Sequence, residues 1–231
     1  MLKVEKLNVY YGESHILRDV EVEVRPGQVV CLMGRNGVGK TTLLKTITGR
    51  LSARSGKVSL GDREVTKLPS FRRARLGLGY APQGREIFGQ LTVYENLLIG
   101  LDGCRNGDRS VPEEIFELFP VLKQMLKRKG GDLSGGQQQQ LAIGRALVSK
   151  PTMLLLDEPT EGIQPSIIQE IERAIRRLRD RGTVGILLVE QYLDFAQRLA
   201  DAFAVMEKGE IVKRGPIAEL TPEVIKRHLA V

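Results

Sequence analysis

The segment from Gly34 to Thr41 combines three glycines, a lysine and a threonine at fixed spacing. It reads Gly34-Arg35-Asn36-Gly37-Val38-Gly39-Lys40-Thr41, which fits the pattern G-x-x-x-x-G-K-[ST]. Glycines let the backbone curl so that successive N–H groups face one anion, and a helix that begins near Lys40 adds its positive dipole end. We expect Lys40 to reach the β- and γ-phosphates of a nucleotide, and the Thr41 hydroxyl, next to Thr42, to bind Mg²⁺. The alternative is a glycine-rich turn without a ligand, and the strand before the segment and the helix after it disfavour this reading.

Two acidic residues follow a short apolar run later in the chain. The run is Met153–Leu156, which is typical of a buried strand, and Asp157 and Glu158 come directly after it. Open α/β sheets bind ligands at the carboxyl ends of their strands, so we expect Asp157 to bind Mg²⁺. Glu158 is predicted to polarise the water that attacks the γ-phosphate. Solvated acids at a strand end are the alternative, which the phosphate-binding segment upstream weakens.

A second glycine-rich helix start lies at Leu133-Ser134-Gly135-Gly136-Gln137. Ser134 is predicted to cap the helix, and Gly135 and Gly136 leave backbone N–H groups accessible to an anion. A chain that binds one nucleotide has no obvious use for a second helix start that can bind an anion.

The elements that must position these residues alternate between strand and helix along most of the chain. Val20, Val22 and Val24 alternate with charged residues, which is typical of a half-exposed strand, and Val29–Met33 is a buried-strand run directly before the phosphate-binding segment. Helices are predicted from about Lys40 to Thr48, from the capping box at Thr92, along the apolar stripe from Ile167 to Leu178 that ends at Gly182, and from Thr221. Between about residues 88 and 150 there is almost no strand pattern. We therefore expect a three-layer α/β domain with a mainly helical insertion.

Composition sets limits on the class of protein. The chain has 231 residues, 42% of them hydrophobic and 27% charged, with a net charge of +7, which excludes wholesale disorder and suits anionic partners. No apolar run approaches the ~20 residues of a membrane-spanning helix, and no secretory signal follows Met1. Cys31 and Cys104 cannot form a disulfide framework, which fits a reduced cytosol.

The three glycine-rich or acidic segments, in this order and spacing, resemble an ATP-binding cassette (ABC) ATPase over essentially the whole chain. The resemblance implies a single domain over residues 1–231 with a P-loop NTPase three-layer core, an N-terminal antiparallel β part and a helical signature subdomain of approximately 88–150. It implies ATP and Mg²⁺ as cofactors. It also implies a head-to-tail dimer with itself or with a paralogous ATPase subunit, in which the Ser134–Gln137 segment of one subunit closes on the γ-phosphate held by the other.

Two further positions match the family. Tyr11 resembles the aromatic residue that stacks on adenine, although the adjacent Tyr10 leaves the assignment open by one position. Gln83, in Ala81-Pro82-Gln83-Gly84, resembles the glutamine that contacts Mg²⁺ and links the core to the helical insertion.

Two positions depart from the wider family. Gln191 stands where a histidine commonly contacts the γ-phosphate, and the chain's two histidines, His15 and His228, are not suitably placed. An amide can donate an N–H to a phosphate oxygen but cannot act as an acid or base, so we expect Gln191 to sense the phosphate while Glu158 polarises water. Gln164 replaces the aspartate usual in the loop after Glu158, so a role for it in communication across the dimer is not transferred.

Several segments of the chain, including those with these departures, are similar to one ATPase subunit of the importers for branched-chain amino acids and urea. The segments that carry this resemblance are Pro82–Phe88, Glu161–Ser166 and Glu190–Gln191, and the segments closest to the urea branch are Ile115–Pro120 and Gln137–Gln140. Urea is therefore the expected solute and branched-chain amino acids the next. The resemblance implies two transmembrane permease subunits, a periplasmic solute-binding protein and a peripheral position on the cytoplasmic face of the inner (plasma) membrane.

Two other classes of function are weighed against transport. A soluble ABC ATPase acting on nucleic acid or ribosomes usually has two cassettes, a long coiled coil or a metal hook, and this chain has one cassette and no sustained heptads. Because no basic strand is interleaved with aromatic residues, we expect no nucleic-acid partner. A P-loop switch protein that does not dimerise would leave Leu133–Gln137 unexplained.

Overall fold

The amino-terminal strands form an antiparallel sheet of four strands. The computed structural model describes residues 1–103 and 110–229, so Cys104 lies outside the described residues. The strand order is β2-β1-β4-β5, with bounds β1 (Leu2–Tyr11), β2 (Ser14–Val24), β4 (Ser55–Leu60) and β5 (Arg63–Glu64). The predicted alternation of β2 is confirmed, because Val20, Val22 and Val24 are buried while Glu23 is exposed. Strands β4 and β5, which the sequence pattern did not indicate, extend this sheet.

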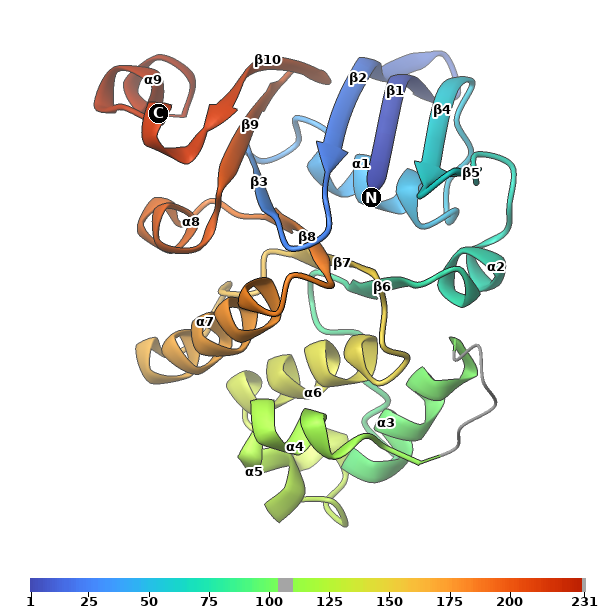
Figure 1. Ribbon diagram of the computed structural model, residues 1–231, viewed down its shortest axis with the longest axis vertical. Coiled ribbons are helices and arrows are strands. Elements are labelled where there is room, and N and C mark those ends of the chain that lie inside the picture. The colour runs from blue at the N-terminus through green and yellow to red at the C-terminus, as the bar shows by residue number, and fades with distance from the viewer. Residues whose placement is uncertain (104–109, 230–231) are drawn as a thin grey trace.

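A second sheet of six strands forms the centre of the molecule (Figure 1). Its order is β10-β9-β3-β8-β7-β6, with bounds β3 (Val29–Met33), β6 (Leu78–Ala81), β7 (Met153–Asp157), β8 (Gly185–Val189), β9 (Ala202–Glu207) and β10 (Glu210–Pro216). All neighbouring strands are parallel except β9 and β10, which form an antiparallel hairpin. Every residue of β3, β7 and β8 is buried, so these strands are continuous apolar runs, as a sheet covered on both faces requires.

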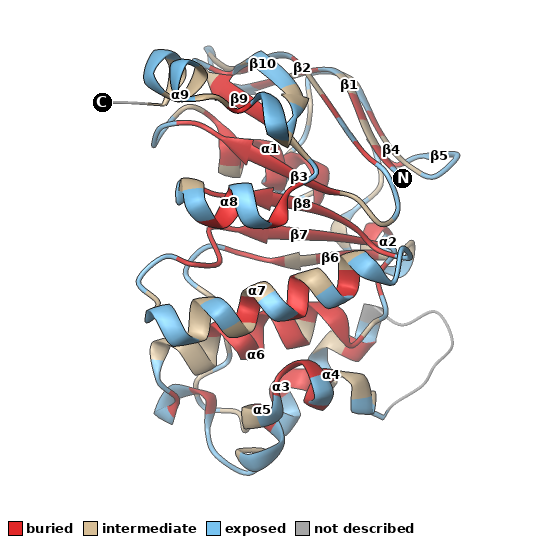
Figure 2. Cartoon of the chain, turned by 60° about the vertical axis from the view of Figure 1, so that its left-hand side comes forward, coloured by how far each residue is buried: buried red, intermediate tan, exposed pale blue. Residues whose placement is uncertain are grey.

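Helices cover both faces of this central sheet. Helix α1 (Lys40–Ile47) packs Leu43, Leu44 and Ile47 into the core that the two sheets share. Helices α7 (Pro165–Asp180) and α8 (Leu193–Leu199) pack on the other face. Alternate residues of β3 point to opposite faces of the sheet, so they belong in turn to the core under α1 and to the core under α7 and α8. Figure 2 shows the buried stripe of α7 turned toward the sheet. The predicted α/β fold with an amino-terminal antiparallel part and a P-loop core is confirmed.

A group of helices lies between β6 and β7 in the chain and below the central sheet in Figure 1. Its helices are α3 (Val93–Gly100), η1 (Leu101–Gly103), α4 (Glu113–Leu118), α5 (Pro120–Gln124), η2 (Gly130–Asp132) and α6 (Gly135–Leu147), and α2 (Ser70–Arg75) precedes β6. The predicted capping box forms at Thr92 with Glu95, and Ser134, predicted as the N-cap of its helix, forms a second capping box with Gln137. These caps set the starts of α3 and α6, and α6 packs against β6 and β7.

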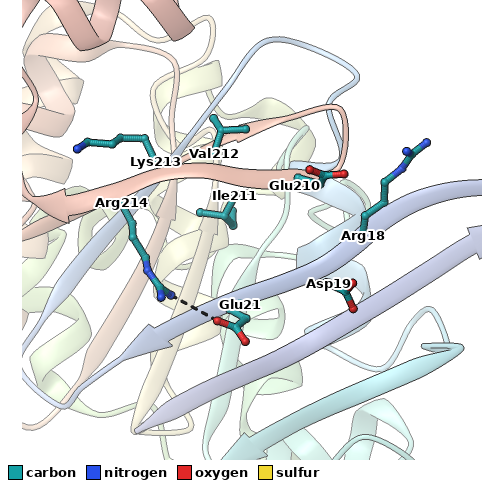
Figure 3. A pocket seen from close by; sticks show the side chains of 8 residues that line it. All are labelled: Arg18, Asp19, Glu21, Glu210, Ile211, Val212, Lys213 and Arg214. Atoms are coloured by element: carbon teal, nitrogen blue, oxygen red, sulfur yellow. Dashed lines mark ion pairs between the residues drawn. The ribbon is translucent and has the colours of Figure 1, made fainter.

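The chain ends with the β9–β10 hairpin, η3 (Ile217–Glu219) and α9 (Pro222–His228). Strand β10 lies beside β2, so the edges of the two sheets meet, and Arg214 forms an ion pair with Glu21 at 3.8 Å (Figure 3). The hollow between these strands is lined by acidic and basic residues in equal number, so it does not favour an anionic ligand. Within the described ranges, no helix combines the length and the apolar character needed to cross a bilayer.

Candidate active site

Four neighbouring parallel strands end at one edge of the central sheet, and each is followed by residues of the candidate site. The phosphate loop, Gly34–Thr41, follows β3, and Gln191 comes two residues after β8. Asp157 ends β7 with Glu158 next to it, and Gln83 comes two residues after β6. Strand order β3-β8-β7-β6 therefore brings together segments that are more than one hundred residues apart in the chain.

The backbone of the phosphate loop takes conformations that favour glycine. Gly34, Gly37 and Gly39 have φ angles of 151°, 79° and 116°. At Gly34 an added Cβ would lie 2.4 Å from the carbonyl oxygen of Met206, so the loop also passes too close to β9 for a side chain. Gly39 caps α1 without a side chain, which leaves the first N–H groups of this helix accessible to an anion.

Lys40 is held inside the phosphate loop. Its side chain is only 5% exposed, and Nζ donates to the carbonyl oxygens of Gly34 at 2.7 Å and Arg35 at 3.0 Å. The same nitrogen lies 3.6 Å from Oε1 of Glu158. A buried ammonium so directed can meet phosphate oxygens at the centre of the loop.

Glu158 is fixed by amides from both neighbouring strand ends. Its Oε2 accepts from Nε2 of Gln83 at 3.1 Å, and its Oε1 accepts from Nε2 of Gln191 at 2.6 Å. Glu158 has a positive φ of 49°, and its N–H donates to the carbonyl oxygen of Val189 at 2.9 Å. The structure thus places three predicted residues, Lys40, Gln83 and Gln191, around one carboxylate.

Asp157 has the environment expected of a metal ligand. It is 1% exposed, Oδ2 accepts a hydrogen bond from the hydroxyl of Tyr80 at 3.4 Å, and the buried Oδ1 has no hydrogen-bond partner among the residues that the structure describes. Burial and the charge of Glu158 raise the pKa of Asp157 to about 6, while interactions with Thr41, Tyr80 and Lys40 oppose the rise. An orphaned carboxylate oxygen and the Thr41 hydroxyl are hard oxygen donors, so these residues fit Mg²⁺.

Two further predicted residues, Gln191 and Tyr11, lie at the edge of the loop. Nε2 of Gln191 also lies 2.8 Å from Oδ1 of Asn36, so the side chain bridges the phosphate loop and Glu158. The hydroxyl of Tyr11 lies 3.5 Å from that of Thr42, and its ring is exposed. Tyr10, the alternative aromatic residue, stacks on His15 with ring centroids 4.1 Å apart. Of the two tyrosines, it is Tyr11 that contacts helix α1.

The signature segment, Leu133–Gln137, is not brought to the phosphate loop of the same chain. Ser134, Gly135, Gly136 and Gln137 line a groove together with Gln164 and α7 residues, whereas the described hollow at the phosphate loop is lined by Gly34, Arg35, Asn36 and residues after β8. Oγ of Ser134 accepts from the N–H of Gln137 at 3.4 Å. Among the described hollows, none contains both sets of residues.

Three residues at the site were not predicted from the sequence. Tyr80 contacts Asp157, Glu161 accepts from Gln83 at 3.0 Å, and Glu190 is a buried carboxylate beside Gln191. The only indication in the sequence was that these residues lie at or just after the ends of predicted strands. It did not predict their contacts, because the residues they contact lie in or after other strands.

The family model described as ABC transporter matches residues 17–161, which is more than half of the chain. The chain belongs to the ABC transporter ATPases. Members of this family bind ATP, generally with Mg²⁺, and hydrolyse it to power transport, so this chain is an ATP hydrolase.

Relatives of this ABC ATPase span its full length. The chain is 46% identical to the high-affinity branched-chain amino acid transport ATP-binding protein BraG of Pseudomonas aeruginosa, over 99% of each chain. It is 40% identical to a probable branched-chain amino acid transport ATP-binding protein, LivF, of Archaeoglobus fulgidus, over 95% of this chain and 94% of that one. A solved nucleotide-free ATP-binding cassette from an ABC transporter superimposes with a TM-score of 0.82 at 31% identity, covering 99% of this chain and 94% of the other. Neither relative is named for urea.

Proposed function

We propose that this chain is the ATP-hydrolysing subunit of an importer of branched-chain amino acids. The observation that carries the proposal is the 46% identity, over 99% of both chains, with a protein named for that transport. The subunit works as a peripheral protein on the cytoplasmic face of the inner membrane, with two transmembrane permease subunits and a periplasmic solute-binding protein. Urea, the solute expected from the sequence motifs, is the second arm of the test described below.

In this proposal ATP lies along the phosphate loop. Adenine stacks on the exposed ring of Tyr11, next to Thr42, while backbone N–H groups of Gly34–Thr41 and the ammonium of Lys40 bind the β- and γ-phosphates. Phosphate oxygens replace the carbonyl oxygens of Gly34 and Arg35 as partners of Lys40. Because the ammonium is already buried and directed into the loop, little reorganisation is needed on binding.

Thr41, Asp157 and Gln83 would hold Mg²⁺, which when bound would neutralise charge on the β- and γ-phosphates. The buried Oδ1 of Asp157, which has no hydrogen-bond partner among the described residues, fits this role. Gln83 is a neutral oxygen donor already near Glu158, so its side chain joins the metal site to the water-polarising carboxylate.

Glu158 accepts a proton from the attacking water at its carboxylate. The amides of Gln83 and Gln191 hold the two oxygens of this carboxylate from opposite sides, which orients it before water arrives. When ATP binds, Gln191 redirects to a γ-phosphate oxygen the amide hydrogen that it otherwise donates to Asn36, a role that does not require it to act as an acid or base.

The Ser134–Gln137 segment serves the phosphate of a second subunit. Its helix start presents N–H groups that no anion of the same chain reaches, since Ser134 lines a groove with Gln164 and not with the phosphate loop. A head-to-tail pair, either of two copies or with a paralogous ATPase subunit, brings this segment onto the γ-phosphate. Two ATP molecules then lie between the subunits.

The segment from Gln83 to Phe88 is the proposed contact with the membrane subunits. It leads into the helical insertion of about residues 88–150, and Phe88 is 49% exposed with the guanidinium of Arg145 5.3 Å from its ring. Phe88→Glu is expected to lower solute uptake far more than basal ATP hydrolysis, and Val212→Glu, at an exposed apolar residue of β10, is the matched control. Equal loss of uptake and hydrolysis in Phe88→Glu would contradict this contact.

The test of the solute uses the complex in vesicles. The chain is purified with its membrane subunits, reconstituted, and supplied with the solute-binding protein and either leucine, isoleucine, valine or urea. ATP hydrolysis stimulated by the amino acids and not by urea is the expected result. Stimulation by urea alone would overturn the amino-acid assignment while leaving the ATPase role intact.

A further inference from the structure

Glu190 is a buried carboxylate with four hydrogen-bond donors around it. The side chain is 2% exposed. One oxygen, Oε1, accepts from the N–H of Thr160 at 3.1 Å and from its hydroxyl at 2.7 Å. The other, Oε2, accepts from the N–H of Gln191 at 3.0 Å and from that of Tyr192 at 3.2 Å.

These donors come from the two segments that flank the water-polarising carboxylate. Thr160 lies two residues after Glu158, in the turn that leads to Gln164. Gln191 reaches Glu158 with its side-chain amide while its backbone N–H is held by Glu190. Glu190 therefore connects the turn after β7, which follows Glu158 directly, to the segment after β8, whose Gln191 contacts Glu158.

Burying a carboxylate costs free energy unless an opposite charge or hydrogen-bond donors stabilise its negative charge. Among the described residues, no lysine, arginine or histidine forms an ion pair with Glu190, so the four N–H and O–H donors stabilise its charge. Burial raises its pKa, and these hydrogen bonds oppose the rise. A neutral amide could accept from only one of the two segments, because its NH₂ group would face donors of the other.

We propose that Glu190 is a positioning residue for ATP hydrolysis: it fixes the turn carrying Thr160 and the segment carrying Gln191 relative to each other, so that Glu158 and Gln191 meet the γ-phosphate together. The inference rests on the roles proposed above for Glu158 and Gln191.

The test is steady-state ATP hydrolysis by the full chain carrying Glu190→Gln. The side chain keeps its size, but one of the two segments loses its acceptor, so kcat is expected to fall about ten-fold or more. The KM for ATP is expected to stay within about two-fold, because the side chain of Glu190 forms no hydrogen bond with Tyr11 or with the phosphate loop among the described residues. Glu172→Gln is the matched control, since Glu172 is a largely buried carboxylate on α7 that binds Arg176 and Arg198 away from the site, and it should leave both constants near the wild-type values.

A double-mutant cycle with Gln191→Ala separates positioning from a structural role. If Glu190 acts partly through Gln191, the two substitutions together lower kcat by less than the product of their separate effects. Thr160→Val, which removes one of the four donors and keeps the shape, is expected to give a smaller fall in kcat and keeps the proposal testable if Glu190→Gln does not fold.

Two outcomes would overturn the proposal, and they differ from failure of the site itself. A kcat for Glu190→Gln within two-fold of wild type, or strictly multiplicative effects with Gln191→Ala, contradicts positioning by Glu190. Full hydrolysis by Glu158→Gln would instead contradict the role of Glu158 on which the inference rests.

Discussion

Asp157 is expected to make the chain less stable in the absence of nucleotide, and Asp157→Asn should remove that cost. The carboxylate is 1% exposed, one of its oxygens is buried without a partner, and Glu158 adds a second negative charge beside it. Asparagine has nearly the same shape and no charge, and its carbonyl oxygen can accept the hydrogen bond of Tyr80. The substitution should therefore stabilise the fold while weakening the proposed magnesium site.

The size of this effect follows from the pKa of Asp157, which is raised from 3.8 to about 6 by burial and by Glu158. One pKa unit corresponds to about 1.4 kcal/mol, so the ionised group costs about 3 kcal/mol at pH values above both. In a chain of this size, removing a cost of about 3 kcal/mol raises the melting temperature of Asp157→Asn by about 6–12 °C. The sign follows from protonation: the folded state holds the proton more tightly, so the cost is absent below pH 3.8, grows as the pH rises and is complete above about pH 7.

Thermal unfolding of wild type and Asp157→Asn without nucleotide, at about pH 7.5 and about pH 4.5, measures this difference. We expect the variant to melt higher at the upper pH and the gap to shrink at the lower one. Mg·ATP should raise the melting temperature of wild type more than that of the variant. Asp180→Asn, at an exposed residue of α7, controls for loss of a negative charge. A variant that melts at or below wild type at about pH 7.5, or a gap that does not change with pH, would refute the reasoning.

Three further substitutions test the site and the packing around it. Glu158→Gln should lower kcat by about 100-fold or more with little loss of ATP binding, measured by phosphate release and by a fluorescent nucleotide, because the proton acceptor is gone. Gln191→Ala should lower kcat by about ten-fold, since it removes the amide that holds Glu158 at 2.6 Å and contacts Asn36 at 2.8 Å; wild-type turnover would exclude the sensing role. Gly100→Ala should destabilise the fold by about 1–3 kcal/mol in urea unfolding, because the new Cβ would lie 2.2 Å from the carbonyl oxygen of Arg145; an unchanged midpoint would mean that α3 shifts freely.

The residues that could be predicted from the sequence are those whose signal is local. The phosphate loop, Asp157, Glu158 and the cap at Ser134 each have their meaning within about eight residues, and the structure forms each element where the pattern predicted it. Gln191 was identified because the family resemblance expects a phosphate-contacting residue directly after the apolar run that forms strand β8. Short motifs of this kind need no knowledge of which strands are neighbours.

The residues that were missed depend on strand order. Tyr80 meets Asp157 because β6 and β7 are parallel neighbours, yet the two residues are 77 apart in sequence. Glu190 reads in the sequence as a charged residue after a strand, and only the pairing of β7 with β8 brings Thr160 to it. Strand β4 was missed because Ser55–Leu60 has few apolar residues. Its place in the sheet depends on the pairing of β4 with β1.

The same strand order explains why the proposed site needs a second chain. Among the described residues, the hydrogen-bond and ion-pair partners of the Glu158 carboxylate and N–H lie in the segments that follow β3, β6 and β8 or at the end of β8, and these strands lie with β7 in one sheet. Ser134 is different, because it begins a helix of the insertion and faces Gln164 and α7. Among the described residues, the signature segment lines a groove with Gln164 and α7 and not with the phosphate loop, so in the proposed function the anion that its N–H groups suit is held by another subunit. A variant with Ser134→Ala should then be rescued in part by a wild-type partner subunit, since each site of a mixed pair takes its phosphate loop from one chain and its signature segment from the other.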